Sequence, residues 1–492
     1  MKFLKTIYYS MSNLNLFSKE LFKSKLTKLL KYRPKMEFID LQPPSTVRNM
    51  TSLDKSAFTK VITVPSITIH IDHLSKTIKK SKKYFLKFCK FNSVVTPNGN
   101  EESRQILLNP ALIKSEEDIK TLMDIDLEVI KGKFSSAEVT VNYENWKCDQ
   151  VLRSVLPENM EGCSGYSIVG HILHLNLREH LHPYKSLIAQ VYLDKTPNVS
   201  LVVNKVDIID NSDNTFRSFS MEKLAGDKSN TVTTVKENNC TFTFDFSKVY
   251  WNPRLSTEHE RIINKLKKGD ILFDIMAGVG PFAIPAGKKK CIVFANDLNP
   301  FSYEALKGNC TSNKVADHVK CFNMDGNDFI RDIIPSSLKN DLKDDFTGDI
   351  HFTMNLPSIA VNFLPSFIGI YTSENVPSLV VSEDKRLIVH VYLFSFNETK
   401  EFAVHTVASK LGFCLKELEF TENIKSIDTE VLRNNIQPHF WDYIIEIVNV
   451  RRVAPAKIMF RVSFHLPSEV LVKDVDKENL HSQPQKKQKV AL

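Results

Sequence analysis

The sequence lacks any apolar run long enough to cross a membrane. Its 492 residues are 42% hydrophobic and 25% charged, which is the balance of an ordinary globular protein. A membrane-spanning helix needs ~18 consecutive apolar residues, and no stretch approaches that length. The opening segment also lacks the continuous apolar core of a secretory signal. We therefore expect no membrane partner, and at this length we expect roughly two or three domains.

The sequence also has no Cys-x-x-Cys pair, the arrangement typical of structural zinc sites. Its eight cysteines are scattered along the chain: Cys89, Cys148, Cys163, Cys240, Cys291, Cys310, Cys321 and Cys414. This spacing fits neither a zinc ligand set nor a disulfide framework. We expect reduced thiols of an intracellular protein and no metal site.

Acidic residues are nearly absent from residues 1–36. This segment carries nine Lys and Arg side chains against Glu20 alone, so its formal charge of +8 equals that of the whole chain. Its apolar residues recur at helical spacing, which is typical of a mitochondrial presequence. A surface helix of the N-terminal domain is the alternative. Residues 37–492 are therefore formally neutral, and the net charge of the chain gives no information about their binding partners.

Two features bear on localisation. Met11 and Met36 are possible internal starts, and initiation at Met36 would remove the presequence-like segment. Near the other end, Lys486-Lys487-Gln488-Lys489 is a weak nuclear-signal candidate, which a disordered tail explains equally well. We expect a protein of the mitochondrial matrix and of the cytoplasm or nucleus.

Changes in sequence pattern divide the chain into five segments. They are a presequence-like segment (1–36), an N-terminal domain (37–150), a mostly β second domain (151–250), a third domain (251–466) and a disordered tail (467–492). In the second domain, Leu187–Leu193 and Val199–Val203 read as strands. The basic run Lys76–Lys90 contains aromatic residues and could bind RNA. We favour an amphipathic helix with a solvated lysine face.

The third domain alternates short apolar strands with segments of helical length. The expected strands are Ile271–Ile275, Cys291–Ala295, Val319–Phe322, Ile350–Met354 and Leu387–Phe394, followed by a closing antiparallel pair at Tyr443–Val448 and Ile458–Phe464. Such alternation predicts an α/β fold with a parallel sheet covered on both faces.

Polar residues and glycines follow the ends of successive strands. Gly278 and Gly280 form a Gly-x-Gly turn after the first strand, where a backbone can approach a ligand closely. The turn lacks the third glycine of the dinucleotide fingerprint, which favours a nucleoside ligand without a pyrophosphate. Asp297, at the end of the second strand, can accept both ribose hydroxyls. Asp325-Gly326 can meet an adenine edge, and Asn355 can present an amide to a planar base.

This order of strand ends favours S-adenosylmethionine as cofactor. Longer strings then carry a family resemblance: Phe216-Arg217, Met221–Asp227, Asp245–Leu255, Glu258–Arg261, the Ala-Gly-Val-Gly-Pro-Phe turn and Asp297–Pro300. The chain resembles the tRNA guanine(37)-N1-methyltransferases of eukaryotes and archaea, well over residues 150–465 and more loosely over 50–150. The resemblance implies a class I, Rossmann-like S-adenosylmethionine-dependent methyltransferase domain preceded by α+β tRNA-binding domains.

The resemblance also implies roles for single residues. Glu258 would be the general base, Arg217 the cation that contacts the base, and Asn355 the amide that orients guanine. The expected cofactor-binding set is His259, Gly278, Gly280, Asp297, Leu298, Asp325, Gly326, Asn355 and Pro357. Archaeal members tend to carry Arg where this chain has His259, which makes the role of that position less certain. The partner would be tRNA, through its anticodon loop and overall shape, bound by a monomer.

Methylation of guanine N1 itself requires a general base and a nearby cation, independently of the family resemblance. Guanine N1 carries a proton at neutral pH, so a carboxylate within reach would contribute roughly 10²–10⁴-fold as a general base. Negative charge then develops on O6, where a guanidinium stabilises it. From spacing alone, however, Arg217 and Glu258 could equally form structural ion pairs, and Asn355 could be a turn residue.

Two other functions stay open at this point. A sister enzyme of the same fold would transfer the aminocarboxypropyl group of the same cofactor to a modified guanine; the Asn355-Leu356-Pro357 string with Glu258 favours methyl transfer instead. A non-catalytic tRNA-binding protein would be expected to lack Glu258 or the Gly-x-Gly turn, and this chain has both.

Overall fold

A computed structural model describes residues 41–97, 99–128, 132–163, 165–206, 221–340, 346–377, 380, 386–395, 399–416, 429–454 and 457–473. The chain divides into two compact units, Met1–Gly162 and Cys163–Leu492, and each is described by itself. The presequence-like segment and most of the tail lie outside the described residues. In the part of the chain described, no helix is long and apolar enough to cross a membrane.

The first unit is built on a four-stranded antiparallel sheet in the order β2-β3-β1-β4. Its strands are β1 (Lys60–His70), β2 (Val94–Val95), β3 (Ser103–Leu107) and β4 (Lys133–Val141), and its helices are η1 (Ser45–Val47), η2 (Ser56–Phe58), α3 (Ile71–Ser81), η3 (Lys82–Tyr84), α4 (Glu116–Leu122), η4 (Tyr143–Asn145) and α5 (Cys148–Val155). In α3, Lys76, Lys79 and Lys80 are exposed while Leu74 and Ile78 pack on the core. The expected lysine face is therefore present, although α3 ends at Ser81.

Helix α5 belongs to the first unit, so the division falls later than the expected boundary at residue 150. Val151 and Val155 are fully buried. The backbone carbonyl of Val155 accepts a hydrogen bond from Asn49 N–H at 2.8 Å, and Arg48 donates to the carbonyls of Arg153 and Leu156 at 2.6 Å. These contacts attach the helix to the start of the same unit.

The second unit opens with a four-stranded sheet in the order β5-β6-β7-β8. Its strands are β5 (Tyr166–Val169), β6 (Ile172–Leu175), β7 (Leu201–Lys205) and β8 (Met221–Gly226), accompanied by η5 (Glu179–Tyr184) and α6 (Lys185–Lys195). The expectation of a strand at Leu187–Leu193 was wrong, because these residues form α6. Leu187, Ile188 and Val191 are all buried, so the helix is apolar around most of its surface and its sequence carries no helical period.

A hairpin joins this sheet to the rest of the unit. It consists of β9 (Val232–Glu237) and β10 (Cys240–Asp245). Asn309 of α9 (Pro300–Ser312) and Asn313, directly after this helix, accept hydrogen bonds from the backbone N–H groups of Thr243 and Thr241 at 2.8 and 2.9 Å. The hairpin therefore packs with the residues after 250, and the unit is not divided at that position.

The main sheet has seven strands in the order β13-β12-β11-β14-β16-β18-β17. They are β11 (Ile271–Asp274), β12 (Ile292–Asn296), β13 (Val319–Phe322), β14 (Ile350–Met354), β16 (Leu387–Ser395), β17 (Ile444–Ala454) and β18 (Lys457–His465). The first five are parallel and the last two antiparallel. The strand order reverses at β11, the first parallel strand along the chain. β12 and β13 lie on one side of β11, and β14 and β16 lie on the other. The expected Rossmann-like α/β fold is confirmed.

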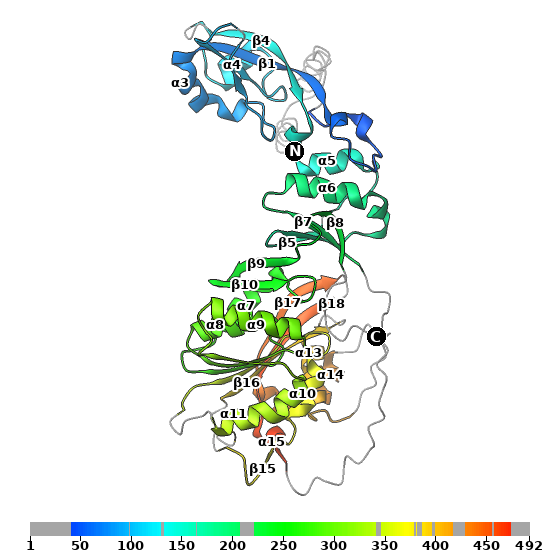
Figure 1. Ribbon diagram of the computed structural model, residues 1–492, viewed down its shortest axis with the longest axis vertical. Helices are drawn as coiled ribbons and strands as arrows, with labels where there is room; N and C mark the ends of the chain where they lie inside the picture. Colours follow the sequence, from blue (N-terminus) through cyan, green and yellow to red (C-terminus); the bar gives the residue numbers. More distant parts are fainter. Residues whose placement is uncertain are drawn as a thin grey trace, which may run out of the picture. The chain divides into compact units, whose positions relative to one another are not determined.

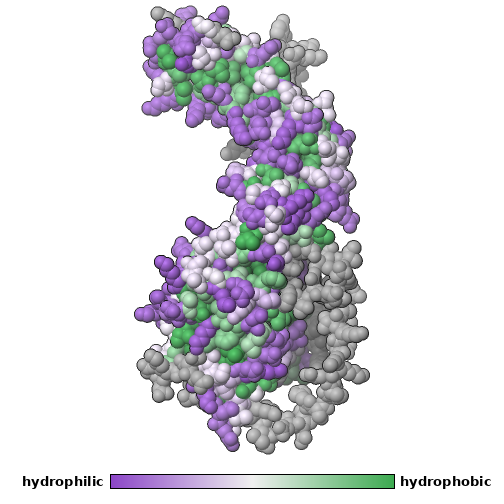
Figure 2. All heavy atoms as spheres, viewed as in Figure 1, coloured by the Kyte–Doolittle hydropathy of each residue, from purple (hydrophilic) through white to green (hydrophobic). Residues whose placement is uncertain are grey.

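Helices cover both faces of this sheet (Figure 1). One face carries η6 (Pro253–Leu255), α7 (Ser256–Ile263), α8 (Ala283–Lys288) and α9; the other carries α10 (Gly326–Asp328), η7 (Phe329–Ile333), α11 (Ile334–Asn340), η8 (Ala360–Phe367), α13 (Lys400–Lys410), α14 (Thr429–Asn435) and η9 (Pro438–Tyr443). The short elements β15 (Tyr371–Thr372), α15 (Ser468–Leu471) and β19 (Val472–Lys473) complete the unit. Apolar side chains fill both interfaces, while polar and apolar residues mix on the visible surface (Figure 2).

Candidate active site

Two glycines shape the turn after β11. Gly278 and Gly280 have φ angles of +55° and +98°, a region that favours glycine. A Cβ atom at position 280 would lie 2.7 Å from Leu306 and 2.8 Å from Ile284. Gly280 thus lets α8 and α9 pack closely behind the turn, which leaves the backbone of Gly278 at the carboxyl edge of the sheet.

Asp297 follows β12 and holds this turn in place. Its Oδ2 accepts a hydrogen bond from Gly278 N–H at 2.8 Å, and its Oδ1 accepts one from Asn299 N–H at 2.9 Å. Burial raises the pKa of Asp297, although these two hydrogen bonds oppose the shift. The Ser302 side chain also hydrogen-bonds to this carboxylate. A carboxylate has about four acceptor positions, so Asp297 can still accept a hydrogen bond from a hydroxyl group of a ligand.

The loop after β13 is fixed against the same turn by Asn296. Its Nδ2 donates to the carbonyls of Ile275 and Met324 at 3.1 and 3.0 Å. Asp325 then caps α10 by accepting from Asn327 N–H at 2.8 Å. A Cβ atom at Gly326 would lie 2.9 Å from the ring of Phe363, so no larger residue fits there without moving the ring.

These strand ends enclose a cavity of about 1110 Å³, counting its open mouth. Seven of the expected residues line it: His259, Gly278, Asp297, Leu298, Asp325, Gly326 and Asn355. Aromatic side chains of Tyr250, Trp251 and Phe363 complete the wall. A cavity with flat apolar walls and polar groups at the strand ends suits a nucleoside-bearing cofactor.

A second, smaller cavity adjoins the first. The two share Tyr250, Asn252, Leu255 and Asn355 as lining residues. The remaining wall of the smaller cavity comes from Pro357, Phe394, Arg451, Val453 and Met459. It therefore offers one cation, two amides and flat apolar surfaces, which is a suitable environment for a planar polar base.

Asn355 lies where the two cavities meet. Its Oδ1 is buried, and within the described residues it has no hydrogen-bond partner. An unsatisfied buried carbonyl costs roughly 1–3 kcal/mol, so a ligand that donates a hydrogen bond there is favoured. Asn355 therefore gives the site a preference for a base with an N–H group at its edge.

Glu258 is buried beneath the site rather than in its wall. Its side chain is 3% exposed and is absent from the described lining of both cavities. Its Oε1 accepts hydrogen bonds from Arg461 Nε at 2.6 Å and from the Tyr392 hydroxyl at 3.0 Å, and its Oε2 accepts one from Arg261. Leu255 and His259, on the same helical segment, do line the larger cavity.

His259 is held in the wall by two contacts. Its Nδ1 lies 2.6 Å from Glu237 Oε1 of β9, and its ring packs edge-on against Phe282 with centroids 4.9 Å apart. Both His259 and Glu237 are largely buried. The hairpin thereby fixes the orientation of a cavity residue.

Besides Glu258, two expected residues that the structure describes, Gly280 and Pro357, do not line the larger cavity. Gly280 supports the turn from behind, as its packing against α8 and α9 shows. Pro357 lines the smaller cavity instead, because the chain leaves β14 in that direction after Asn355. Arg217 lies outside the described residues.

Two protein-family models match parts of this chain. The model of the TRM5/TYW2 methyltransferase domain matches residues 233–376, and that of the TYW2 N-terminal domain matches residues 148–229. The first match begins in the β9–β10 hairpin, in agreement with the packing of that hairpin against α9.

Curated relatives cover nearly the whole chain. A tRNA (guanine(37)-N(1))-methyltransferase of Anopheles gambiae is 43% identical over 92% of this chain and 75% of its own length. The proteins of the same name from Drosophila melanogaster and Homo sapiens are 42% and 39% identical, over 90% and 91% of this chain and 91% and 83% of their own lengths. The chain belongs to the tRNA (guanine(37)-N1)-methyltransferase family. The expected family membership is thus confirmed.

Two solved structures have a fold similar to that of this methyltransferase. Trm5b from Pyrococcus abyssi is 18% identical, with a TM-score of 0.51 over 82% of this chain and 99% of its own. In the solved complex of aTrm5 and tRNALeu, the protein is 19% identical, with a TM-score of 0.53 over 81% of this chain and 98% of its own. At such identities the likeness concerns the fold alone.

Several lining residues were not expected from the sequence. Tyr250, Trp251 and Asn252 stand in a string used for the family resemblance, but no role was inferred for them. Phe394 of β16 and Met459 of β18 are neighbours on adjacent antiparallel strands. Nothing in the local sequence of these two strands indicates a binding site.

Proposed function

We propose that this chain transfers the methyl group of S-adenosylmethionine to N1 of guanine 37 in tRNA. The observation that carries the proposal is the unsatisfied Oδ1 of Asn355 between two adjoining cavities. The larger cavity would hold the cofactor and the smaller one the target base. Guanine presents N1–H and N2–H donors to such an acceptor, whereas adenine presents an acceptor at N1.

The larger cavity fits S-adenosylmethionine by its donors and acceptors. Asp297 has lone pairs for the ribose hydroxyls, Asp325 and Gly326 lie by the place of the adenine edge, and the Gly278 turn gives the backbone close access. When bound, the cofactor supplies an electrophilic methyl group. His259 and Leu298 would contribute to its binding as further lining residues.

Glu258 would accept the N1 proton. Its carboxylate is paired with the cations Arg461 and Arg261. Arg261 is 41% exposed, so its contact is the weaker one and can open as the side chain turns towards the base. In enzymes without bound substrate such catalytic contacts are often not yet formed.

Arg217 would stabilise the negative charge that develops on O6. Arg451 lines the smaller cavity, and its pKa is lowered by burial and by the nearby Arg254. A cavity that concentrates positive charge in this way suits a base that becomes anionic as it loses a proton. The target base must leave its stack to enter, which costs least in a loop.

A labelling experiment tests the proposal against transfer of the aminocarboxypropyl group. A tRNA transcript with guanine 37 would be incubated with S-adenosylmethionine labelled either in the methyl group or in the carboxyl group. Incorporation of the methyl label alone, at guanine N1, is expected. Incorporation of the carboxyl label would overturn the proposal in favour of aminocarboxypropyl transfer. If neither label is incorporated while the cofactor binds, the non-catalytic alternative holds.

We further propose that residues 1–36 direct part of the protein to mitochondria and that the remainder acts in the cytoplasm or nucleus as a monomer. The excess of basic over acidic residues in this segment supports the targeting role. Mass spectrometry of N-termini from mitochondrial and cytosolic fractions would test it. Identical N-termini in both fractions would contradict it.

A further inference from the structure

A column of buried polar side chains crosses the sheet face that packs against α7. Arg461, Ser463, His390 and Glu258 are between 0% and 3% exposed. On the antiparallel pair β16–β18, Tyr392 is opposite Arg461 and His390 is opposite Ser463. This face would otherwise be apolar, since the neighbouring residues belong to a hydrophobic core. Buried charges and polar groups destabilise the folded state unless they are paired. Their presence in an apolar core therefore suggests a functional role for this column.

Arg461 is the centre of the column. Its Nε donates to Glu258 Oε1 at 2.6 Å, its Nη1 donates to Ser463 Oγ, and both Nη atoms lie 3.3 Å from Glu446 Oε2. A planar guanidinium bound on three sides has one permitted orientation. Glu446 is in turn paired with Lys265 at 2.8 Å, so the charges around Arg461 are balanced.

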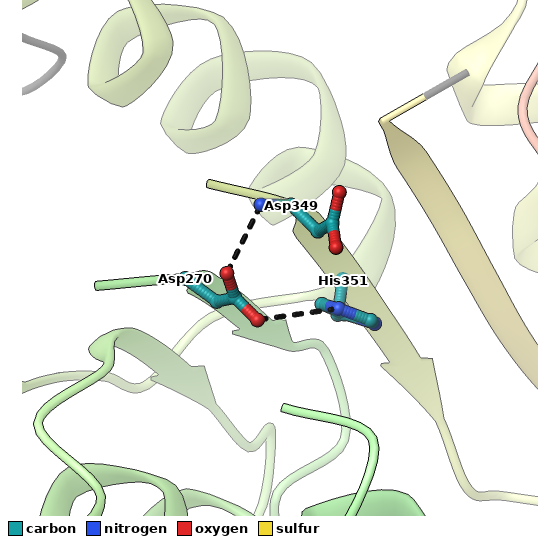
Figure 3. Close-up of side chains that lie close together, drawn as sticks. All are labelled: Asp270, Asp349 and His351. Atoms are coloured by element: carbon teal, nitrogen blue, oxygen red, sulfur yellow. Dashed lines mark hydrogen bonds and ion pairs between the residues drawn. The ribbon is translucent and has the colours of Figure 1, made fainter. Parts of the chain in front are cut away.

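The column continues from Ser463 to the opposite end of the sheet. Ser463 Oγ lies 2.8 Å from His390 Nδ1, and His390 Nε2 lies 3.1 Å from His351 Nδ1. His351 Nε2 then faces Asp270 Oδ2 at 3.8 Å (Figure 3). Asp270 is anchored by hydrogen bonds from the backbone N–H groups of Lys267 and Asp349 at 2.7 and 3.0 Å.

Arg461 can only donate, so Ser463 Oγ accepts from it and keeps its own hydrogen for another acceptor. With the His390 tautomer that has a lone pair on Nδ1, Ser463 would donate to His390, and His390 would donate from Nε2 to His351 Nδ1. His351 would then carry its hydrogen on Nε2, on the side of Asp270.

The column reaches the floor of the smaller cavity. Phe394 and Met459 line that cavity and are opposite each other on β16 and β18. Tyr392 is two residues from Phe394 on β16, and Arg461 is two residues from Met459 on β18. Because side chains alternate along a strand, all four lie on the same face of the sheet. Glu258, bound to Tyr392 and Arg461, therefore lies one layer of side chains below the place of the target base.

We propose that Arg461 is a positioning residue for the reaction, which pairs with the carboxylate of Glu258 and holds it in place beneath the target base, and that Ser463, His390, His351 and Asp270 fix its orientation. This inference rests on the proposed role of Glu258 as general base. Arg461 is assigned this role rather than Arg261 because Arg461 is fully buried, whereas Arg261 is 41% exposed and its charge is screened by solvent.

Single-turnover methyl transfer across a range of pH tests the proposal. In Arg461→Met the carboxylate of Glu258 loses its buried cation, so its ionised form is less favourable and the acid limb of the pH–rate profile should move to higher pH. The groups facing this carboxylate or its partners are Arg261 of α7, Tyr392 and His390 of β16, Glu446 of β17, Lys265 and Asp274. They stay unchanged, so the movement would report the loss of Arg461.

The expected rate is about 10²-fold lower in Arg461→Met, with most of the rate restored in Arg461→Lys, which keeps the cation. Ser463→Ala should lower the rate by a smaller factor without removing the charge. Arg433→Met is the matched control, since Arg433 is exposed on α14 and stacks on Trp441. The dissociation constant of S-adenosylmethionine, expected to be unchanged, shows that each variant is folded.

A double-mutant cycle separates positioning from a general structural role. If Arg461 acts through Glu258, Glu258→Gln with Arg461→Met should be no slower than Glu258→Gln alone. Additive losses, or a lower rate without movement of the acid limb, would overturn the proposal. If Glu258→Gln itself keeps the full rate, the general base is another group and the proposed role of Glu258 fails first. If Arg461→Met does not fold, the Arg461→Lys profile decides, and an unshifted profile with an unchanged rate would contradict the role.

Discussion

The two adjoining cavities are built in different ways. The larger one is lined by turns that directly follow successive strands, at Gly278, Asp297, Asp325 and Asn355. The smaller one draws its distinct wall from Phe394 of β16, Arg451 of β17 and Met459 of β18. The first is the product of a repeated local pattern; the second exists only after the antiparallel strands have closed the sheet.

This difference separates cofactor binding from recognition of the base. The carboxyl ends of parallel strands form a ligand site in many proteins of this fold, so the larger cavity fits a cofactor used widely. The smaller cavity depends on β17 and β18, and on the charged column behind them. Changes to the two cavities should therefore affect different measured quantities, in the order of size given below.

The largest effect is expected for Glu258→Gln. The amide keeps the shape of the side chain but cannot accept the N1 proton, so kcat should fall by roughly 10²–10⁴-fold. The dissociation constant of S-adenosylmethionine should be unchanged, because Glu258 lines neither cavity in the described structure. Glu260→Gln, an exposed neighbour on α7, serves as control. Full turnover in Glu258→Gln would rule out the base role.

Asn355→Ala should have the next largest effect. It removes the unsatisfied acceptor between the cavities, and a good contact to a base edge is worth ~1–3 kcal/mol. The kcat/KM for tRNA should fall by about 10- to 100-fold. The exposed Asn362→Ala on η8 is the control and should leave the value unchanged. An equal loss in both variants would contradict a contact between Asn355 and the base.

Asp297→Ala should act on the cofactor instead. It removes the acceptor of the Gly278 and Asn299 N–H groups as well as the expected ribose contact. The dissociation constant of S-adenosylmethionine, measured by calorimetry, should rise by about 10-fold, while kcat at saturating cofactor changes less. Asp317→Ala, at an exposed position, gives the baseline. An unaltered dissociation constant would count against the ribose contact.

The smallest effect concerns stability. Burial raises the pKa of Asp274 to about 7, against the opposing hydrogen bond from Thr353. The folded state therefore binds this proton more tightly than the unfolded state does. The stabilisation it provides is complete below pH 3.8 and is lost as pH rises to about 7. Asp274→Asn should thus raise the free energy of unfolding by about 1–3 kcal/mol at pH 8 and change it little at acid pH.

Chemical denaturation of both proteins at pH 8 and pH 5 would check this. The gain from Asp274→Asn should be clearly smaller at pH 5 than at pH 8, because at pH 5 the folded wild-type carboxyl group carries its proton while only the unfolded one is largely ionised. An equal gain at both pH values would show that the folded side chain is already ionised at pH 5, and so that burial does not raise its pKa.

The sequence predicted what depends on local pattern. The strands of the main sheet, the Gly-x-Gly turn and the polar strand ends follow from short apolar runs and the residues directly after them. The prediction failed at Leu187–Leu193, where an apolar run of α6 is buried on most sides and no period distinguishes helix from strand. It also separated the β9–β10 hairpin from the methyltransferase domain, since the contacts that connect them, among them the hydrogen bonds to Asn309 and Asn313 and the contact between Glu237 and His259, join residues distant in the sequence.

Contacts between residues that are distant in the sequence could not be predicted from the sequence. Glu258 and Arg461 are 203 positions apart, and neither carries a local signal that predicts the other as partner. The smaller cavity has the same character, because Tyr250 and Met459 become neighbours only through the fold. The family resemblance predicted Glu258 and Asn355 as site residues but did not indicate the buried column behind them.

The most direct test of the account is the choice of base at position 37. Single-turnover methyl transfer would be measured on tRNA transcripts that differ only in carrying guanine, inosine or adenine there. The account predicts methylation at N1 of guanine and, more slowly, of inosine, which keeps N1–H but lacks the amino group, and none of adenine. Methylation of adenine at a rate similar to that of guanine would contradict the claim that the Asn355 acceptor reads the N–H edge of the base.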